Sequence, residues 1–131
     1  DAEGKKHCET IMNAVGQVSW VDNEGLMDPV TAVSGSGPAY VFLLIEALAD
    51  AGVEAGLDRP LADKLALATV AGSGALAEKS SLPPSVLRQN VTSPGGTTEA
   101  ALEILMADSG MKSLLSAAVR KATDKSKELA S

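Results

Sequence analysis

The chain has 131 residues, of which 45% are hydrophobic and only 2% are aromatic. This composition excludes a disordered chain, and its wealth of alanine and leucine favours helices over a β-sandwich. A formal net charge of −6 argues against nucleic acid as a partner. The single cysteine, Cys8, permits no internal disulfide and suits a reducing cytosol. Beside His7 it has no second cluster of ligands, so we expect no metal site.

The first 22 residues combine a short helix with an isolated strand. Residues 2–15 predict the helix, on which Ile11 and Val15 share a face. Residues 17–21 alternate in polarity and predict a brief strand. A single strand needs a partner for its backbone groups, and no other segment of the sequence reads as a strand. The strand therefore pairs with another chain or belongs to a sheet outside this sequence.

The middle of the sequence predicts two long helices. A helical turn over 26–33 is followed by a loop over 34–38, and a helix then runs from Pro38 to about Ala55. A second helix runs from an N-cap at Asp58 to about residue 79. It is apolar nearly all round, which is typical of a helix buried in a large core or between subunits.

Shorter helices make up the rest of the chain. The sequence predicts helices over 84–90, 97–107 and 111–129, joined by turns rich in proline, serine and glycine. No apolar run reads as long enough to span a bilayer, because acidic residues interrupt the most hydrophobic helix. We therefore expect no membrane partner and a cytoplasmic protein.

The run from Asn90 to Thr98 holds the strongest signal for chemistry. Its two adjacent glycines let backbone N–H groups approach a ligand closely, and a helix beginning at Thr97 adds unpaired donors and a partial positive charge. Together these features predict a seat for a carboxylate or a phosphate. The structural alternative is a tight turn followed by a helix whose N-cap is Thr97 or Thr98.

Three motifs occur in a characteristic order and spacing. They are Ser34-Gly35-Ser36-Gly37-Pro38-Ala39-Tyr40, Glu46-Ala47-Leu48-Ala49-Asp50-Ala51-Gly52-Val53 and Val91-Thr92-Ser93-Pro94-Gly95-Gly96-Thr97-Thr98. In order and spacing they resemble the C-terminal half of the pyrroline-5-carboxylate reductases. The resemblance covers roughly residues 15–130, and two small departures are Asp58 and Leu82, where the family commonly has proline and histidine.

The resemblance implies a fold and an activity. Members of the family reduce 1-pyrroline-5-carboxylate to L-proline with NADPH or NADH, which is the last step of proline biosynthesis. A Rossmann domain precedes their helical domain. By resemblance, residues 23–131 are an all-α helical bundle that dimerises by interlocking helices and binds substrate. Residues 1–22 are then the last helix and strand of the Rossmann domain. The implied partner is a second copy of the chain, with rings of dimers as a further possibility.

The resemblance also implies the roles of the glycine-rich loop. Backbone N–H groups around Gly96, Thr97 and Thr98 would hold the substrate carboxylate, with help from the Ser93 hydroxyl. Glycine at 95 and 96 would leave room for the ring. The Thr98 hydroxyl is the best candidate for the catalytic group, as a hydrogen-bonding partner of the ring nitrogen; threonine is too weak an acid to donate a proton freely.

A second segment, residues 34–38, has two interpretations. As structure it links two helices, and as function it lines the active site beneath the nicotinamide. The motif Gly-x-Gly-x-x-Gly is missing, because Pro38, Ala39 and Tyr40 follow the glycines there. We therefore expect that this chain alone binds no dinucleotide and is inactive, although the intact enzyme uses NADPH or NADH.

Two other functions remain open. The chain could be an oligomerisation module without a ligand, or the helical domain of another dehydrogenase that follows a Rossmann domain. Binding of a ligand at the loop separates the first alternative from the reductase. A preference for proline over other small carboxylates separates the second.

Overall fold

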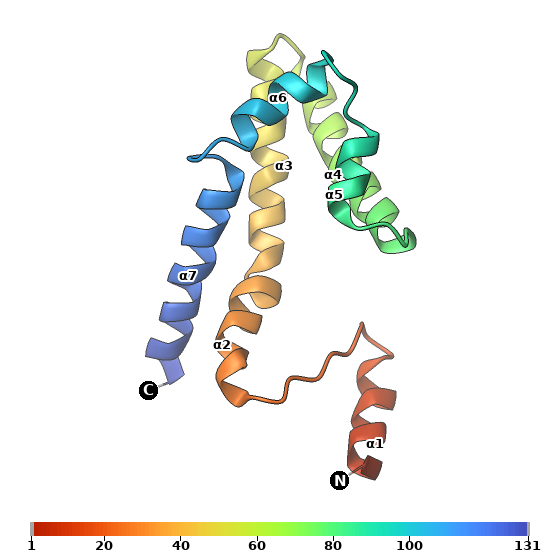
Figure 1. Ribbon diagram of the computed structural model, residues 1–131, viewed down its shortest axis with the longest axis vertical. Coiled ribbons are helices and arrows are strands. Elements are labelled where there is room, and N and C mark those ends of the chain that lie inside the picture. Colours follow the sequence, from red (N-terminus) through yellow and green to blue (C-terminus); the bar gives the residue numbers. More distant parts are fainter. Residues whose placement is uncertain (1, 131) are drawn as a thin grey trace.

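Segments rich in alanine and leucine are helical throughout the part of the chain that the computed structural model describes, residues 2–130 (Figure 1). The predicted domains also include Asp1 and Ser131, which lie outside the described residues. The elements are α1 (Ala2–Met12), a 3₁₀ turn η1 (Glu24–Leu26), α2 (Met27–Val30), a π-helical turn η2 (Thr31–Gly35), α3 (Gly37–Glu54), α4 (Arg59–Lys79), α5 (Pro84–Asn90), α6 (Thr97–Leu105) and α7 (Met111–Ala130). The predicted all-α fold is confirmed, and the five helices expected from residue 38 onward end within two residues of their predicted bounds.

The antiparallel hairpin of α3 and α4 contains the best-packed contact of the chain. Ala49 on α3 and Ala62 and Ala66 on α4 are buried, with Ile45 and Val53 packed against them. Small side chains let the two helix axes approach closely. A β-carbon added at Gly52 would lie 3.4 Å from the Cβ of Ala62, which shows how little space remains.

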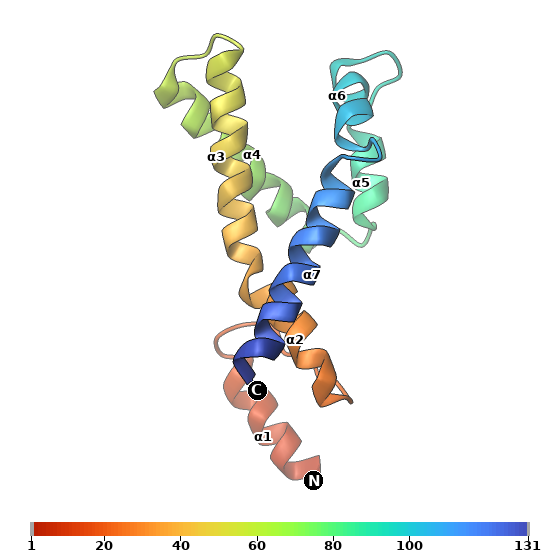
Figure 2. The ribbon, with the colours of Figure 1, turned by 90° about the vertical axis from the view of Figure 1, so that its left-hand side faces the viewer.

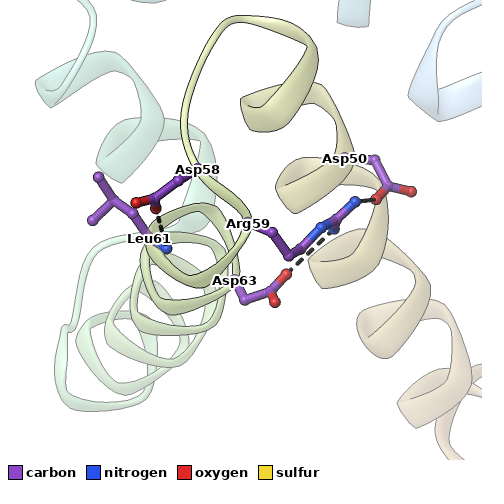
Figure 3. A network of polar contacts seen from close by, with 5 residues as sticks. All are labelled: Asp50, Asp58, Arg59, Leu61 and Asp63. Carbon is purple, nitrogen blue, oxygen red and sulfur yellow. Dashed lines mark hydrogen bonds and ion pairs between the residues drawn. The ribbon is translucent and has the colours of Figure 1, made fainter.

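Polar contacts close the tip of this hairpin (Figure 3). The chain turns at Gly56, whose φ of 105° suits glycine. The Asp58 carboxylate accepts a hydrogen bond from the backbone N–H of Leu61 at 2.9 Å and caps α4, as predicted. Arg59 pairs with Asp50 at 2.7 Å and with Asp63 at 3.3 Å. The hydrogen bond to Asp50, and then the one to Asp63, raises the pKa of the Arg59 guanidinium.

The loop predicted over residues 34–38 is wrong, because the chain remains helical there except at Ser36. The backbone N–H of Ser36 donates to the carbonyl of Thr31 at 2.9 Å, an i to i−5 bond that widens the helix into a π-turn. The Tyr40 hydroxyl donates to the carbonyl of Ala32 at 3.1 Å. These bonds keep the glycine-rich segment helical, so that η1, α2, η2 and α3 form one nearly continuous run.

The last helix, α7, lies beside α2 and η2 and brings two distant parts of the chain together (Figures 1 and 2). The hydroxyl of Ser126 donates to the carboxylate of Asp28 at 2.6 Å across 98 positions of sequence. This half-buried bond fastens the C-terminal part of α7 to α2.

The strand predicted over residues 17–21 is also wrong. These residues form no regular secondary structure, and no strand exists elsewhere in residues 2–130 with which they could share a ladder. The indole N–H of Trp20 instead donates to Glu9 at 2.7 Å, and the Lys5 ammonium lies 4.6 Å from the ring centroid. Helix α1, which ends three residues earlier than expected, projects away from the other helices (Figure 2).

The described chain buries very little of its apolar surface. Its accessible surface is 10247 Å², whereas a folded monomer of this mass exposes about 6,450 Å². Alanines at 32, 49, 62 and 66 are the only buried hydrophobic residues among those described, and Phe42 and Leu43 are 62% and 63% exposed. The single chain therefore exposes a broad apolar surface, and burial of this surface against another molecule would be favourable.

One part of this surface qualifies the expectation about membranes. By length and composition alone, the helical run Glu24–Glu54 could cross a bilayer, and 11% of its most apolar window is buried within the chain. Helices that lie between subunits of a protein meet the same two criteria.

Candidate functional site

The turn that precedes α6 is built around Pro94 and Gly95. The backbone N–H of Gly96 donates to the carbonyl of Ser93 at 3.0 Å, which closes a four-residue β-turn. Proline in the second position and a residue of positive φ in the third are typical of a type II turn. Gly95 has a φ of 69°, and this explains why glycine stands there.

Gly96 is required for a different reason, which is space. Its φ of −88° and ψ of 171° are open to any residue. A β-carbon at this position, however, would lie 3.0 Å from the carbonyl oxygen and 3.4 Å from the Cβ of Ser93. The absence of a side chain lets the turn fold tightly against the start of α6.

The N-terminus of α6 has no side-chain cap. Gly96 is the N-cap, so the alternative with Thr97 or Thr98 in that position is wrong. The first helical hydrogen bond runs from Ala100 to Gly96, at 3.2 Å. Within residues 2–130, the N–H groups of Thr97, Thr98 and Glu99 consequently have no hydrogen-bond partner. Three free donors at the positive end of a helix are an arrangement typical of anion-binding sites.

The predicted site residues lie together in this segment, in unequal environments. Ser93, Gly95 and Thr97 are exposed, while Gly96 and Thr98 are half-buried. The Gly96 N–H is engaged in the turn, so the donors open to a ligand belong to the helix rather than to the glycines.

Sequence reasoning missed Glu99, which reaches back over the turn. Its carboxylate oxygen Oε2 accepts a hydrogen bond from the backbone N–H of Gly95 at 2.7 Å. A glutamate in the third helical position commonly bonds the N–H of the N-cap in a capping box. In this chain the N-cap N–H already serves the turn, so the carboxylate bonds the preceding residue. The spacing of Glu99 from the glycines is the signal that could have revealed it.

Helix α5 supports the loop from the other side. The Thr92 hydroxyl donates to the carbonyl of Arg88 at 2.7 Å, and its backbone N–H donates to the carbonyl of Gln89 at 3.0 Å. An open groove of about 330 Å³ lies between α5 and α6. Its lining comprises Arg88, Gln89, Thr92, Glu99, Leu102, Glu103 and Met106.

The second candidate segment, residues 34–38, does not join the loop within one chain. It belongs to the junction of η2 and α3, near α2, whereas α6 lies toward the opposite end of the molecule (Figures 1 and 2). A site that combines the two segments would need a second subunit.

The described residues show no place for a metal or a dinucleotide. No group of three or more histidine, cysteine, aspartate or glutamate side chains is arranged to hold an ion within residues 2–130. The same residues contain no strand that leads through a glycine-rich turn into a helix, which is the element that binds a dinucleotide.

Comparisons with known proteins agree on one family. The family model described as pyrroline-5-carboxylate reductase dimerisation matches residues 24–129. The pyrroline-5-carboxylate reductase of Pseudomonas aeruginosa is 48% identical over 92% of this chain, and that of Synechocystis is 52% identical over 92%. The chain spans 44% and 45% of these relatives, so it corresponds to less than half of either protein.

Solved structures give the same result. The pyrroline-5-carboxylate reductase of Coxiella burnetii superposes with a TM-score of 0.93 at 42% identity, over 98% of this chain and 47% of its own. The Plasmodium falciparum pyrroline carboxylate reductase with NADP bound gives 0.84 at 42% identity, over 100% of this chain and 49% of its own. Membership of a dimerisation family accounts for the uncovered apolar surface by self-association rather than by a bilayer. This chain belongs to the family of pyrroline-5-carboxylate reductase dimerisation domains.

Proposed function

We propose that the chain is the dimerisation and substrate-binding part of an enzyme that reduces 1-pyrroline-5-carboxylate to L-proline with NADPH or NADH, in the last step of proline biosynthesis. The relatives that bear this name support the reaction. The observation that carries the assignment of the site is the uncapped start of α6, where three backbone donors have no partner among the described residues. This feature suits the single carboxylate of the substrate.

Residues 1–22 are assigned to a preceding nucleotide-binding domain, and residues 23–131 to the dimerising domain. The family match, which begins at residue 24, supports this boundary. The described residues do not fit a dinucleotide, so we assign NADPH or NADH to a part of the enzyme outside this chain.

The residues of the loop have different roles in binding the substrate. The N–H groups of Thr97 and Thr98, at the positive end of α6, bind the carboxylate, and the exposed Ser93 hydroxyl adds a further donor. Glycine at 95 shapes the turn and glycine at 96 lets it fold tightly against α6, and in our proposal the missing side chains also leave room for the ring. The alignment of a bound ring in this way contributes to catalysis by orientation.

Thr98 is the residue that we place at the reacting atoms. Reduction of the imine adds a hydride to carbon and a proton to nitrogen. The ring nitrogen therefore needs a hydrogen-bonding partner during the reaction. We assign to the half-buried Thr98 side chain the role of orienting that nitrogen or of relaying a proton from solvent. Its hydroxyl is too weakly acidic to be the source of the proton.

The functional unit is a homodimer, in which each site uses elements of both subunits. The accessible surface of one chain exceeds that of a folded monomer by about 3,800 Å², which is more than enough for the per-subunit share of an obligate interface. A second subunit would also bring the η2–α3 junction to the loop. Assembly of dimers into rings and a cytoplasmic location complete the proposal.

Steady-state kinetics of the complete enzyme that carries this chain test the assignment. We expect reduction of 1-pyrroline-5-carboxylate with oxidation of NADPH or NADH, and Thr98→Ala should lower kcat/KM about a hundredfold without changing the melting temperature. Thr98→Ser, which keeps the hydroxyl, should recover most of the activity.

Three results would contradict the proposal. A complete enzyme without activity on 1-pyrroline-5-carboxylate would favour the oligomerisation module, or, if it reduced another cyclic imine, a different dehydrogenase. Near-normal turnover of Thr98→Ala would remove that residue from the site.

A further inference from the structure

The hydrogen bond between Glu99 and Gly95 lies outside the roles given to the loop so far. The carboxylate oxygen of Glu99 is 2.7 Å from the backbone nitrogen of Gly95. Both residues are exposed, so the bond does not complete a buried core. Its effect must therefore be sought in the conformation of the turn.

The N–H of Gly95 belongs to the central peptide of the β-turn, between Pro94 and Gly95. Type I and type II turns differ chiefly in the orientation of this peptide, which rotates by roughly 180° between them. Proline in the second position suits both types, and glycine in the third position adopts either sign of φ. The residues of the turn therefore favour the type II orientation, with its φ of 69° at Gly95, but leave the type I orientation accessible.

Glu99 favours the type II orientation of the Pro94–Gly95 peptide. Its carboxylate stands over the start of α6 and accepts a hydrogen bond only while the Gly95 N–H points toward it. Rotation of the peptide would replace that N–H by the carbonyl oxygen of Pro94. An oxygen in that place would repel a substrate carboxylate, and it would compete for the free N–H of Thr98, which lies four residues further along the chain.

We propose that Glu99 is a positioning residue, which fixes the Pro94–Gly95 peptide in the type II orientation and so keeps the N–H groups of Thr97 and Thr98 open to the substrate carboxylate. The inference rests on the proposed function of the loop and adds a residue to it. Glu99 acts through Gly95 and does not touch the substrate.

This role predicts a characteristic kinetic effect. Without the hydrogen bond, part of the population has the rotated peptide, and the apparent affinity falls in proportion to the competent fraction. Substrate and transition state lose the same interaction, so KM rises while kcat changes little. We expect a rise in KM of about tenfold for Glu99→Ala.

Variants of the complete enzyme test the inference. Glu99→Gln keeps an acceptor oxygen without the charge, and its KM should stay within about threefold of the parent value. Glu103→Ala is the matched control, because Glu103 lines the same groove one turn later and has no hydrogen bond to the loop. Its KM and kcat should equal those of the parent. In a crystal structure of Glu99→Ala, Gly95 should have a negative φ.

Gly95→Ala provides a second route to the same state. Alanine disfavours the positive φ of the type II turn, so this variant should raise KM for 1-pyrroline-5-carboxylate even with Glu99 present. The double variant Glu99→Ala with Gly95→Ala should have a KM higher than that of either single variant, because both changes lower the fraction of the same competent peptide orientation.

The outcomes separate this inference from the function on which it rests. An inactive parent enzyme contradicts the function itself. An active parent in which Glu99→Ala leaves KM unchanged, or lowers it, overturns the positioning role; a lower KM would make Glu99 a competitor of the substrate carboxylate. An equal rise in KM for Glu99→Ala and Glu99→Gln would also overturn it, because the charge and not the hydrogen bond would then be responsible.

Discussion

The α3–α4 hairpin and the α5–α6 segment begin their second helix in opposite ways. Asp58 caps α4 with a carboxylate, whereas the N-cap of α6 is a glycine that offers no side chain. The hairpin buries Ala49, Ala62 and Ala66, but neither α5 nor α6 has a buried residue. The hairpin therefore closes one helix start and one small packed contact within the chain, although apolar side chains such as Phe42 stay exposed on it, whereas the α5–α6 segment does neither.

This difference agrees with the position of the site that we propose. An uncapped helix start is costly unless water or a ligand supplies the missing acceptors. A segment without a buried residue likewise needs an external surface to order it. We infer that a second subunit orders α5 and α6 and that the substrate completes the start of α6, so the weaker of the two regions is the functional one.

The largest effect is expected from disrupting the proposed subunit interface. Phe42, on α3, is 62% exposed in the single chain, and a charge at a desolvated interface position is strongly unfavourable. We expect Phe42→Asp to weaken self-association at least a hundredfold, measured by sedimentation equilibrium. In the dissociated variant, amide hydrogen exchange should rise more in α5 and α6 than at the buried face of α3 and α4.

Lys79→Asp is the control for this experiment. It also adds an aspartate, but at the exposed end of α4 where no apolar side chain is removed. A Phe42→Asp variant that remained a dimer would contradict the proposed interface. An equal loss of hydrogen-exchange protection in both regions would contradict the difference drawn between the α3–α4 hairpin and the α5–α6 segment.

An intermediate effect is expected from overpacking the hairpin. Ala62 is buried against Gly52, and the larger side chain of Ala62→Leu has no space between the two helices. We expect a loss of about 2–3 kcal/mol in the free energy of unfolding, measured by urea titration at fixed protein concentration. Ala55→Leu, at the exposed end of α3, is the control and should change stability by less than about 0.5 kcal/mol. Equal effects of the two variants would show that the hairpin contact is loosely packed.

The bounds of the two helices in the hairpin could be predicted from the sequence because their determinants are local, whereas the packing of one helix on the other was not predicted. Apolar periodicity, the glycine at its turn, and Asp58 with Pro60 after it mark the ends of both helices. The π-turn was missed because its i to i−5 bonds leave little trace in a periodicity of 3.6 residues. The strand at residues 17–21 was predicted wrongly because pairing depends on a partner strand that the described residues do not contain.

The candidate site was predictable only in part. The glycine-rich run predicted the position of an anion seat and resemblance to the family supplied the substrate that we propose for it; both stay predictions. The capping alternative with Thr97 or Thr98 depended on a one-residue difference in where α6 begins, and such differences are beyond propensity arguments. Glu99 was missed because its hydrogen bond to the Gly95 N–H depends on the turn, in which the N–H of Gly96 already donates to Ser93.

The smallest effect is expected at the cap that distinguishes the two helix starts. Asp58→Ala removes the acceptor that holds the Leu61 N–H at 2.9 Å, and such changes typically cost about 1 kcal/mol. The expected loss in the free energy of unfolding is therefore about a third to a half of that for Ala62→Leu, in the same urea titration. Asp58→Asn should keep the free energy of unfolding of the parent, because asparagine caps helices as well as aspartate does. A loss in Asp58→Asn equal to that in Asp58→Ala would instead attribute the effect to the negative charge beside the helix dipole and to Arg59. The start of α4 would then be stabilised electrostatically, and the contrast with the open start of α6 would lie in charge rather than in a hydrogen bond.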